Sequence, residues 1–167
     1  MSLQTVLQSI QNSGLSLWIR QNPAIFPIIE SLHVVAITLV FGTIMIVDLR
    51  LLGFASHRRS ANKLIAELLP FTWGAFILAV VTGSLLFTAN APAYANNTQF
   101  QLKMLVMLAA GVNMVIFHMT AHRRIAVWDS VSPPPTAARL AGVTSLILWV
   151  AVIYVGRWIG FTLDILF

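Results

Sequence analysis

Three ionisable side chains lie within or at the edges of one long apolar stretch of the sequence. They are Glu30, His33 and Asp48. Ionisable groups are costly in hydrocarbon, and those that occur in membrane helices usually face a bundle interior, a pathway or a ligand. At about 100° per residue, Glu30 and Asp48 each lie about 60° from His33 around a helix. One face of this predicted helix therefore carries groups that can bind a metal, a cofactor or a proton.

A second helical face combines basic, thioether and imidazole groups. Its residues recur at helical spacing, and they are Lys103, Met107, Ala110, Met114 and His118. The chain contains no cysteine, which excludes disulfides, iron–sulfur clusters and thiolate metal sites. A metal ion in this protein would therefore be held by histidine, methionine, carboxylate or lysine side chains.

The composition places both faces in a membrane protein. The chain has 167 residues, of which 58% are hydrophobic and 9% charged, and its mean hydropathy is +0.85. Four separate apolar segments of about 20 residues are each long enough to cross a bilayer core of ~30 Å. The sequence therefore predicts an all-α integral membrane protein in which residues 1–167 form one membrane domain, a four-transmembrane-helix up-down bundle.

The expected spans cover residues 25–54, 65–88, 100–122 and 140–161. Residues 1–20 are expected to form an uncharged amphipathic helix that lies on the membrane surface. The net charge of +5 does not indicate nucleic acid, because the basic residues cluster at the ends of the apolar segments. Seven of the ten Lys and Arg residues flank the connections after the first and third spans. This predicts a multi-pass membrane protein with both termini outside and the basic loops in the cytoplasm.

Helical rise and this topology together predict an outer cluster of polar side chains. His33 lies roughly 10 to 12 Å from the outer surface, and the start of the third span reaches the same depth. The cluster comprises Glu30, His33, Lys103, Met107 and Arg157, which we predict as cofactor-binding residues. Two structural alternatives stay open, a Glu30–Arg157 ion pair and a hydrogen bond of His33 within the bundle.

The remaining histidines are expected near the cytoplasmic side. His118 lies roughly 27 Å deep, in the same layer as Asp48, so it cannot share an ion or a haem iron with His33. His118 and His122 are spaced i, i+4 and could hold a metal together, with solvation at the interface as the alternative. His57 is expected to belong to the positive interface.

Two apolar segments carry a resemblance to known families. LHVVAITLVFGTIMIVDLR followed by FQLKMLVMLAAGVNMVIFH resembles an uncharacterised family of bacterial four-helix inner-membrane proteins. More distantly, the first and third spans are similar to HemJ-type protoporphyrinogen oxidases and CopD-type copper-resistance proteins. His33, Gly42, Arg50 and Lys103 fall at nearly matching places of the HemJ-type pattern. That resemblance implies a b-type haem, with His33 as the ligand of the haem iron and Lys103 as an essential polar partner.

Three functions follow as hypotheses, and whether the protein is an enzyme stays open. In the first, the protein binds haem b and has a redox or electron-transfer role, with a quinone or another redox partner. Lys103 or Met107 then approaches the second axial position, and Arg157 neutralises a propionate. The second is a small ion or metal transport or metal-handling protein. The third is a non-enzymatic membrane partner or assembly factor, with homo-oligomer contacts through Gly156 and Gly160.

Overall fold

The structure is a computed structural model that describes residues 2–54, 60–129 and 134–163. The described residues form helices and contain no strand. The helices are α1 (Leu3–Gln11), α2 (Gly14–Gln21), α3 (Ile25–Leu52), α4 (Ala61–Ala89), α5 (Ala91–Asn96), α6 (Thr98–Met119), the 3₁₀ helix η1 (His122–Arg124), α7 (Ile125–Trp128) and α8 (Thr136–Thr162). The expected all-α membrane fold is confirmed, and residue 57 lies outside the described residues.

Four of these helices are long and apolar enough to cross a membrane. They are α3, α4, α6 and α8, of 28, 29, 22 and 27 residues. Many of their large apolar side chains are exposed, as contact with lipid requires. Helix α4 begins four residues earlier than expected because the Ser60 hydroxyl caps it, accepting a hydrogen bond from the Lys63 N–H.

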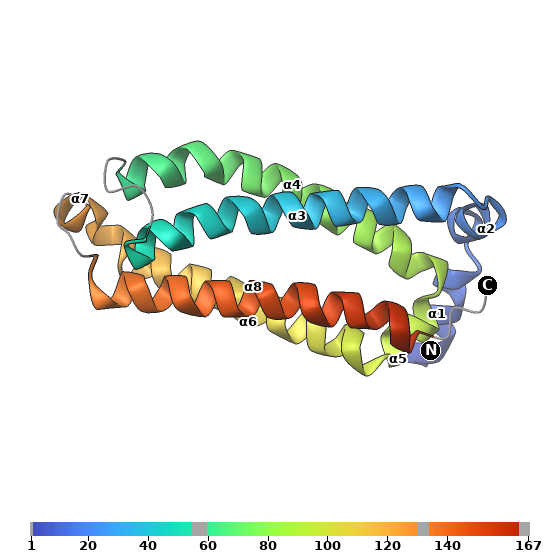
Figure 1. Cartoon of the computed structure of the whole chain (residues 1–167). Helices are drawn as coiled ribbons and strands as arrows, with labels where there is room; N and C mark the ends of the chain where they lie inside the picture. The colour runs from blue at the N-terminus through green and yellow to red at the C-terminus, as the bar shows by residue number, and fades with distance from the viewer. Residues whose placement is uncertain (1, 55–59, 130–133, 164–167) are drawn as a thin grey trace.

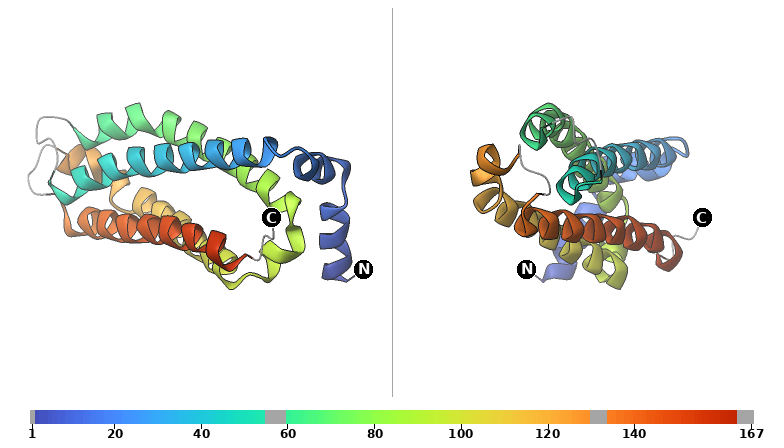
Figure 2. Two further views of the ribbon diagram at one scale, coloured as in Figure 1. Left: turned by 45° about the vertical axis from the view of Figure 1, so that its right-hand side comes forward. Right: turned by 60° about the vertical axis from the view of Figure 1, so that its left-hand side comes forward.

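The long helices are arranged as two pairs (Figure 1). Helix α3 packs along α4, α6 packs along α8, and the two pairs meet where α3 packs against α8. Among the described residues, α4 and α6 have no comparable packing. Figure 2 shows the pairs spreading apart toward the end of the bundle that carries α1, α2 and α5, here called the α5 end. The pairs therefore meet mainly along α3 and α8, whereas α4 and α6 meet at their ends, through the stacked rings of Phe87 and Phe100 and the apolar cluster that contains Ile65 and Phe117.

A glycine sets the closest approach between the two pairs. A Cβ atom added at Gly142 of α8 would lie 3.2 Å from the Asp48 carbonyl oxygen and 3.3 Å from the Leu51 Cβ of α3. Both distances are shorter than ordinary contacts, so a larger residue would push the helices apart. Gly142 thus presses α8 against α3 beside Asp48.

The N-terminal segment differs from the single helix expected over residues 1–20. It forms two helices, α1 and α2, because the Ser13 hydroxyl caps a new helix by accepting a hydrogen bond from the Ser16 N–H. The fully buried Ser16 hydroxyl donates to the Thr88 carbonyl of α4 at 2.8 Å. Helix α1 packs against α5. The N-terminal helices are therefore fixed to the α5 end of the bundle.

One aspartate ties the opposite, α7 end together. The carboxylate of Asp129 accepts hydrogen bonds from the Ala61 N–H at 2.6 Å and the Asn62 N–H at 3.1 Å, at the start of α4. It also pairs with the Arg50 guanidinium at 3.4 Å, and both side chains are about nine-tenths buried. The neighbouring Trp128 donates its indole N–H to a backbone carbonyl inside the apolar cluster at this end. Residues from α3, α4 and the connection after α7 are therefore joined at one point.

Candidate functional site

The four long helices surround a cavity of about 360 Å³. All four helices contribute to its wall, which is mostly apolar. Its polar side chains include Asp48 of α3, Thr72 of α4, Asn113 and His118 of α6, and Ser145 of α8. An apolar cavity with a few convergent polar groups is the usual form of a small-molecule site.

Asp48 is the most unusual residue of this wall. The residue is only 5% exposed, and the Ser145 hydroxyl is placed to donate a hydrogen bond to its carboxyl group. The other carboxyl oxygen, Oδ2, is buried and has no hydrogen-bond partner in the described residues. A buried polar oxygen without a partner is costly. Asp48 therefore holds a buried acceptor beside the cavity, and a rotation of its carboxyl group would present this oxygen to a ligand that carries an N–H or O–H group or a positive charge.

One face of α6 supplies the soft ligands of the cavity. Met107, Ala110, Met114 and His118 all line it, as their helical spacing predicted. The His118 Nδ1 lies 2.8 Å from the Met114 carbonyl oxygen. Because a carbonyl oxygen only accepts, Nδ1 carries the proton and Nε2 keeps its lone pair. His118 is therefore in the tautomer that can ligate a metal through Nε2.

Hydrogen bonds between helices hold the polar wall in place. The hydroxyls of Thr72 and Thr43 lie 2.8 Å apart and join α4 to α3. The Asn113 amide donates to the Ala141 carbonyl at 3.0 Å and joins α6 to α8. Each bond links helices of the same pair, so each pair is fixed internally.

His33 lies outside the cavity wall, in the contact between α3 and α4. Its Nδ1 is 2.9 Å from the Thr82 hydroxyl oxygen, whose proton is directed to the Leu78 carbonyl 2.7 Å away. Nδ1 therefore donates to Thr82, and a backbone hydrogen bond with Ala79 of α4 also holds the ring. A Cβ atom added at Gly83 would lie 2.9 Å from the His33 Cε1. The glycine thus makes room for the imidazole ring, which supports the structural alternative for His33.

Of the residues expected to cluster with His33, Lys103 is one that the structure does bring close to it. The two side chains are close enough to interact electrostatically. The Lys103 side chain lies along Gly156 of α8, where an added Cβ would meet Nζ at 3.4 Å. Gly156 thus faces the inside of the bundle, whereas an added Cβ at Gly160 would meet no atom within 4 Å. A homo-oligomer through this glycine pair stays a prediction.

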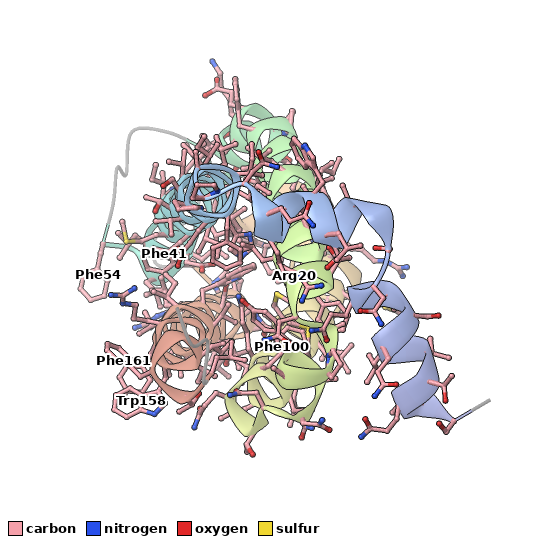
Figure 3. The ribbon with its side chains drawn as sticks, turned by 90° about the vertical axis from the view of Figure 1, so that its right-hand side faces the viewer. Arg20, Phe41, Phe54, Phe100, Trp158 and Phe161 are labelled. Atoms are coloured by element: carbon pink, nitrogen blue, oxygen red, sulfur yellow. The ribbon has the colours of Figure 1, made fainter. Side chains whose placement is uncertain are left out.

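Glu30 and Arg157 are not part of one cluster with His33. Both are exposed, and no ion pair joins them within the described residues. The Arg157 guanidinium lies over the Phe161 ring, 5.5 Å from its centroid, and Phe161 projects away from α8 in Figure 3. Burial, and then the Glu30 carboxylate, raise the pKa of Tyr94 in α5. Glu30 therefore faces the α5 helix, and Arg157 faces the surroundings of the bundle.

The second histidine pair is formed. The rings of His118 and His122 lie 4.9 Å apart between centroids, and the buried Nδ1 of His122 has no hydrogen-bond partner among the described residues. Burial, and then the nearby His118, lower the pKa of His122. No group of three or more histidine, aspartate or glutamate side chains suited to a metal occurs in the described residues. The pair alone therefore supplies two ligands at most.

The ligand set expected for haem b does not surround one space. His33 packs between α3 and α4, Met107 lines the central cavity, and the Arg157 guanidinium lies over an exposed ring. Residues around His33 thus do not fit a haem with Arg157 at a propionate. Whether the protein binds haem stays a prediction.

Sequence reasoning placed Asp48 on the polar face of its helix but missed it as the centre of a site. The signal was present, since Asp48 was expected in the same layer as His118 and both line the cavity. Asn113 was missed as well, although it lies next to Met114 on the face of α6 already identified. Ser145 carried no signal, because a serine in an apolar helix commonly bonds to its own backbone.

Comparisons with known proteins identify a family but no function. Residues 22–162 match the family model described as "Family of unknown function (DUF6644)". No curated protein matches the chain, and no solved structure does. The resemblance to an uncharacterised membrane family therefore stands, and that to HemJ-type and CopD-type proteins stays an expectation.

Proposed function

The chain belongs to the DUF6644 family of unknown function, and from its geometry we propose that it is a membrane-embedded binding protein. Its ligand is a small, mostly apolar molecule with one hydrogen-bond-donating polar group. The molecule occupies the central cavity, and its polar group bonds to Asp48.

The observation that carries this proposal is the free Oδ2 of Asp48 in the cavity wall. A buried carboxyl group that served only the fold would be expected to have both oxygens satisfied. Here Ser145 reaches the carboxyl group from one side, and the free oxygen is on a side chain that lines the cavity. An ammonium or hydroxyl group of a ligand would complete its hydrogen bonding. The apolar wall would then favour a hydrocarbon body over a strongly hydrated ion.

Ligand-induced stabilisation tests the proposal. The purified protein in dodecyl maltoside micelles is titrated with dodecylamine, and thermal unfolding is followed by circular dichroism. A ligand at 100 times its Kd stabilises the native state by about 2.7 kcal/mol, which raises Tm by roughly 5 to 11 °C for a chain of this size. Asp48→Asn keeps the shape of the side chain and should lose most of this shift.

The matched control is Glu30→Gln, which neutralises an exposed carboxylate. It should keep the full shift. Dodecanol, which carries a hydroxyl head, is titrated in the same way. An equal rise in Tm for the wild type and Asp48→Asn, or no rise for the wild type with either ligand, would refute the proposal.

A second candidate function, haem or metal binding, is favoured by the lone pair of His118 Nε2 on the same wall. Met107 and Met114 line the cavity beside it, and thioether ligands suit a haem iron or a soft metal ion. This candidate retains the hypotheses of a redox protein and of a metal-handling protein. It assigns the residue that ligates the iron or metal ion to His118 instead of His33. A bound haem would supply one-electron chemistry.

Absorption spectra separate the two candidates. Protein made with ample haem should show a Soret band that His118→Ala removes and His33→Ala retains. Metal analysis of the same samples covers a bound ion. Absence of both the band and stoichiometric metal would exclude this candidate without affecting the Asp48 proposal.

The localisation is also a proposal. The distribution of Lys and Arg supports a bacterial inner-membrane protein whose α7 end faces the cytoplasm and whose α5 end faces outward. Reporter fusions after Ala61 should then give a cytoplasmic signal, and fusions after Asn97 an external one. The opposite pattern would reverse the orientation while leaving the cavity argument unchanged.

A further inference from the structure

A second opening adjoins the central cavity on the α4–α6 side of the bundle. It has a volume of about 260 Å³, and its wall comes from α4 and α6 only. We call this region the α4–α6 seam, and its residues are Leu69, Trp73, Met114, Val115, His118 and Met119. Four of these residues also line the central cavity, namely Leu69, Trp73, Met114 and His118. The two spaces therefore share a wall and lie next to each other.

The seam opens on the outer surface of the membrane-spanning helices. Its side chains are mainly apolar, and several are well exposed within membrane-spanning helices. Val115 is 50% exposed, Met119 is 58% exposed and Trp73 is 46% exposed. Because the spans containing them must lie in the bilayer, these surfaces contact acyl chains.

In the described residues no side-chain hydrogen bond crosses the seam itself. The side-chain hydrogen bonds between long helices join α3 to α4, α6 to α8, or, through Asp48 and Ser145, α3 to α8, and none joins α4 to α6 in the described part of the chain. The tight glycine contact lies on the opposite side, between α8 and α3. The two helices are held at the ends of the seam, by the stacked rings of Phe87 and Phe100 and by the apolar cluster that contains Ile65 and Phe117. A movement of the seam side chains between these points would break no hydrogen bond and no close glycine contact among the described residues.

We propose that the α4–α6 seam is a lateral access route through which a single-chain amphiphile dissolved in the bilayer reaches Asp48 and in which its hydrocarbon tail remains. This inference rests on the proposed function. It adds the class of ligand, a membrane-dissolved amphiphile with an ammonium or hydroxyl head. The polar head of such a molecule would bond to the Asp48 carboxyl group, and its hydrocarbon tail would fill the apolar seam. A compact soluble molecule would leave the seam unfilled.

Cross-linking across the seam tests the route, and the absence of native cysteine makes the chemistry specific. The double variant Leu69→Cys/Val115→Cys is closed with a short bismaleimide in liposomes. The control is Asn97→Cys/Thr162→Cys, which joins the start of α6 to the end of α8 at positions whose side chains lie 3.0 Å apart, outside both cavities. The probe is dodecylamine brominated at the end of its chain, which quenches nearby tryptophan fluorescence. The signal of Trp73 is obtained as the difference between matched proteins with and without Trp73→Phe.

We expect the probe to quench Trp73 and cross-linking of the seam to slow quenching by about tenfold or more, an increase of ~1.4 kcal/mol in the access barrier. The control cross-link should leave the rate of its own untreated variant unchanged, and the untreated seam variant supplies the reference rate for the cross-linked seam. Equal rates with the seam open and closed, or equal slowing by the control cross-link, would overturn the lateral route. So would failure of the seam to cross-link while the control pair reacts.

The two proposals fail in different ways. If the cross-linked protein still shows Asp48-dependent stabilisation by dodecylamine at an unchanged rate, the binding function stands and the route is wrong. If Asp48→Asn and the wild type bind the probe equally well, the binding function is wrong, and the route has no site to serve.

Discussion

Asp129 offers the sharpest test of how the α7 end is held together. Its carboxylate joins the Arg50 guanidinium and the first two N–H groups of α4. Removal of one member of a buried ion pair costs about 3 to 5 kcal/mol, and loss of a helix N-cap costs about 0.5 to 2 kcal/mol. These interactions share one side chain, and further contacts of Arg50 soften the loss. For Asp129→Ala we therefore expect unfolding to become easier by about 4 kcal/mol.

The measurement is thermal unfolding of the purified protein in detergent micelles. A loss of ~4 kcal/mol corresponds to a fall in Tm of roughly 8 to 16 °C for a chain of this size. Asp129→Asn keeps one acceptor for the α4 N–H groups but loses the charge, so its Tm should lie between those of Asp129→Ala and the wild type. A change below about 2 °C for Asp129→Ala would refute the reasoning, because it would mean that the contacts are replaced by water at no cost.

A double-mutant cycle separates the ion pair from the helix cap. Arg50→Met should destabilise the wild type more than it destabilises the Asp129→Ala protein. The difference should be about 1 to 3 kcal/mol if the two side chains interact directly. Additive effects would assign the role of Asp129 to the α4 N-terminus alone.

Three further predictions follow from other contacts. Gly83→Ala should lower Tm, because its Cβ would lie 2.9 Å from the His33 ring, whereas Gly74→Ala on the same helix meets no atom within 4 Å and should be neutral or stabilising by up to ~1 kcal/mol. The pKa of His122 in the folded protein lies below its ordinary value of 6.5, so the neutral form of the ring favours folding. The contribution of His122 to stability is therefore present above pH 6.5 and is lost as the pH falls below 6.5. Tm measured between pH 7.5 and 5 should therefore decline less for His122→Asn than for the wild type, and parallel declines would contradict this. Ser16→Ala removes the buried hydroxyl that holds α2 to α4, and faster proteolysis of the N-terminal helices, with little change in bundle Tm, is expected.

The sequence was sufficient to predict the four spans, because a bilayer requires both apolar composition and a minimum helix length. It did not predict the start of α4, since Ser60 and Asp129 complete that end and Asp129 lies 68 residues from Ala61. The break between α1 and α2 was also missed. A local signal existed, namely Ser13 at a capping position.

For the candidate site, the sequence predicted how deep each residue lies along its helix better than it predicted the direction in which the side chain points. Helical rise placed His33 near Lys103 and Asp48 in one layer with His118. The structure brings His33 and Lys103 close together, and it places Asp48 and His118 on the wall of one cavity. Arg157 was assigned to the same cluster because its depth matched, but its side chain turns to the surroundings. In a span that is apolar all round, periodicity does not reveal which face turns inward. That orientation depends on contacts such as the one at Gly142, which involve residues far apart in the sequence.

The joint at Asp129 also imposes an order on biosynthesis. Helices α3 and α4 are made first, but the group that completes the start of α4 is made 68 residues after Ala61. At a synthesis rate of about 5 to 20 residues per second, the nascent chain waits roughly 3 to 14 seconds for this residue. During that interval the first hairpin has Arg50 and the α4 amides without their aspartate. Water, lipid headgroups or an insertion factor must bind these groups until the second hairpin is inserted and Asp129 takes their place.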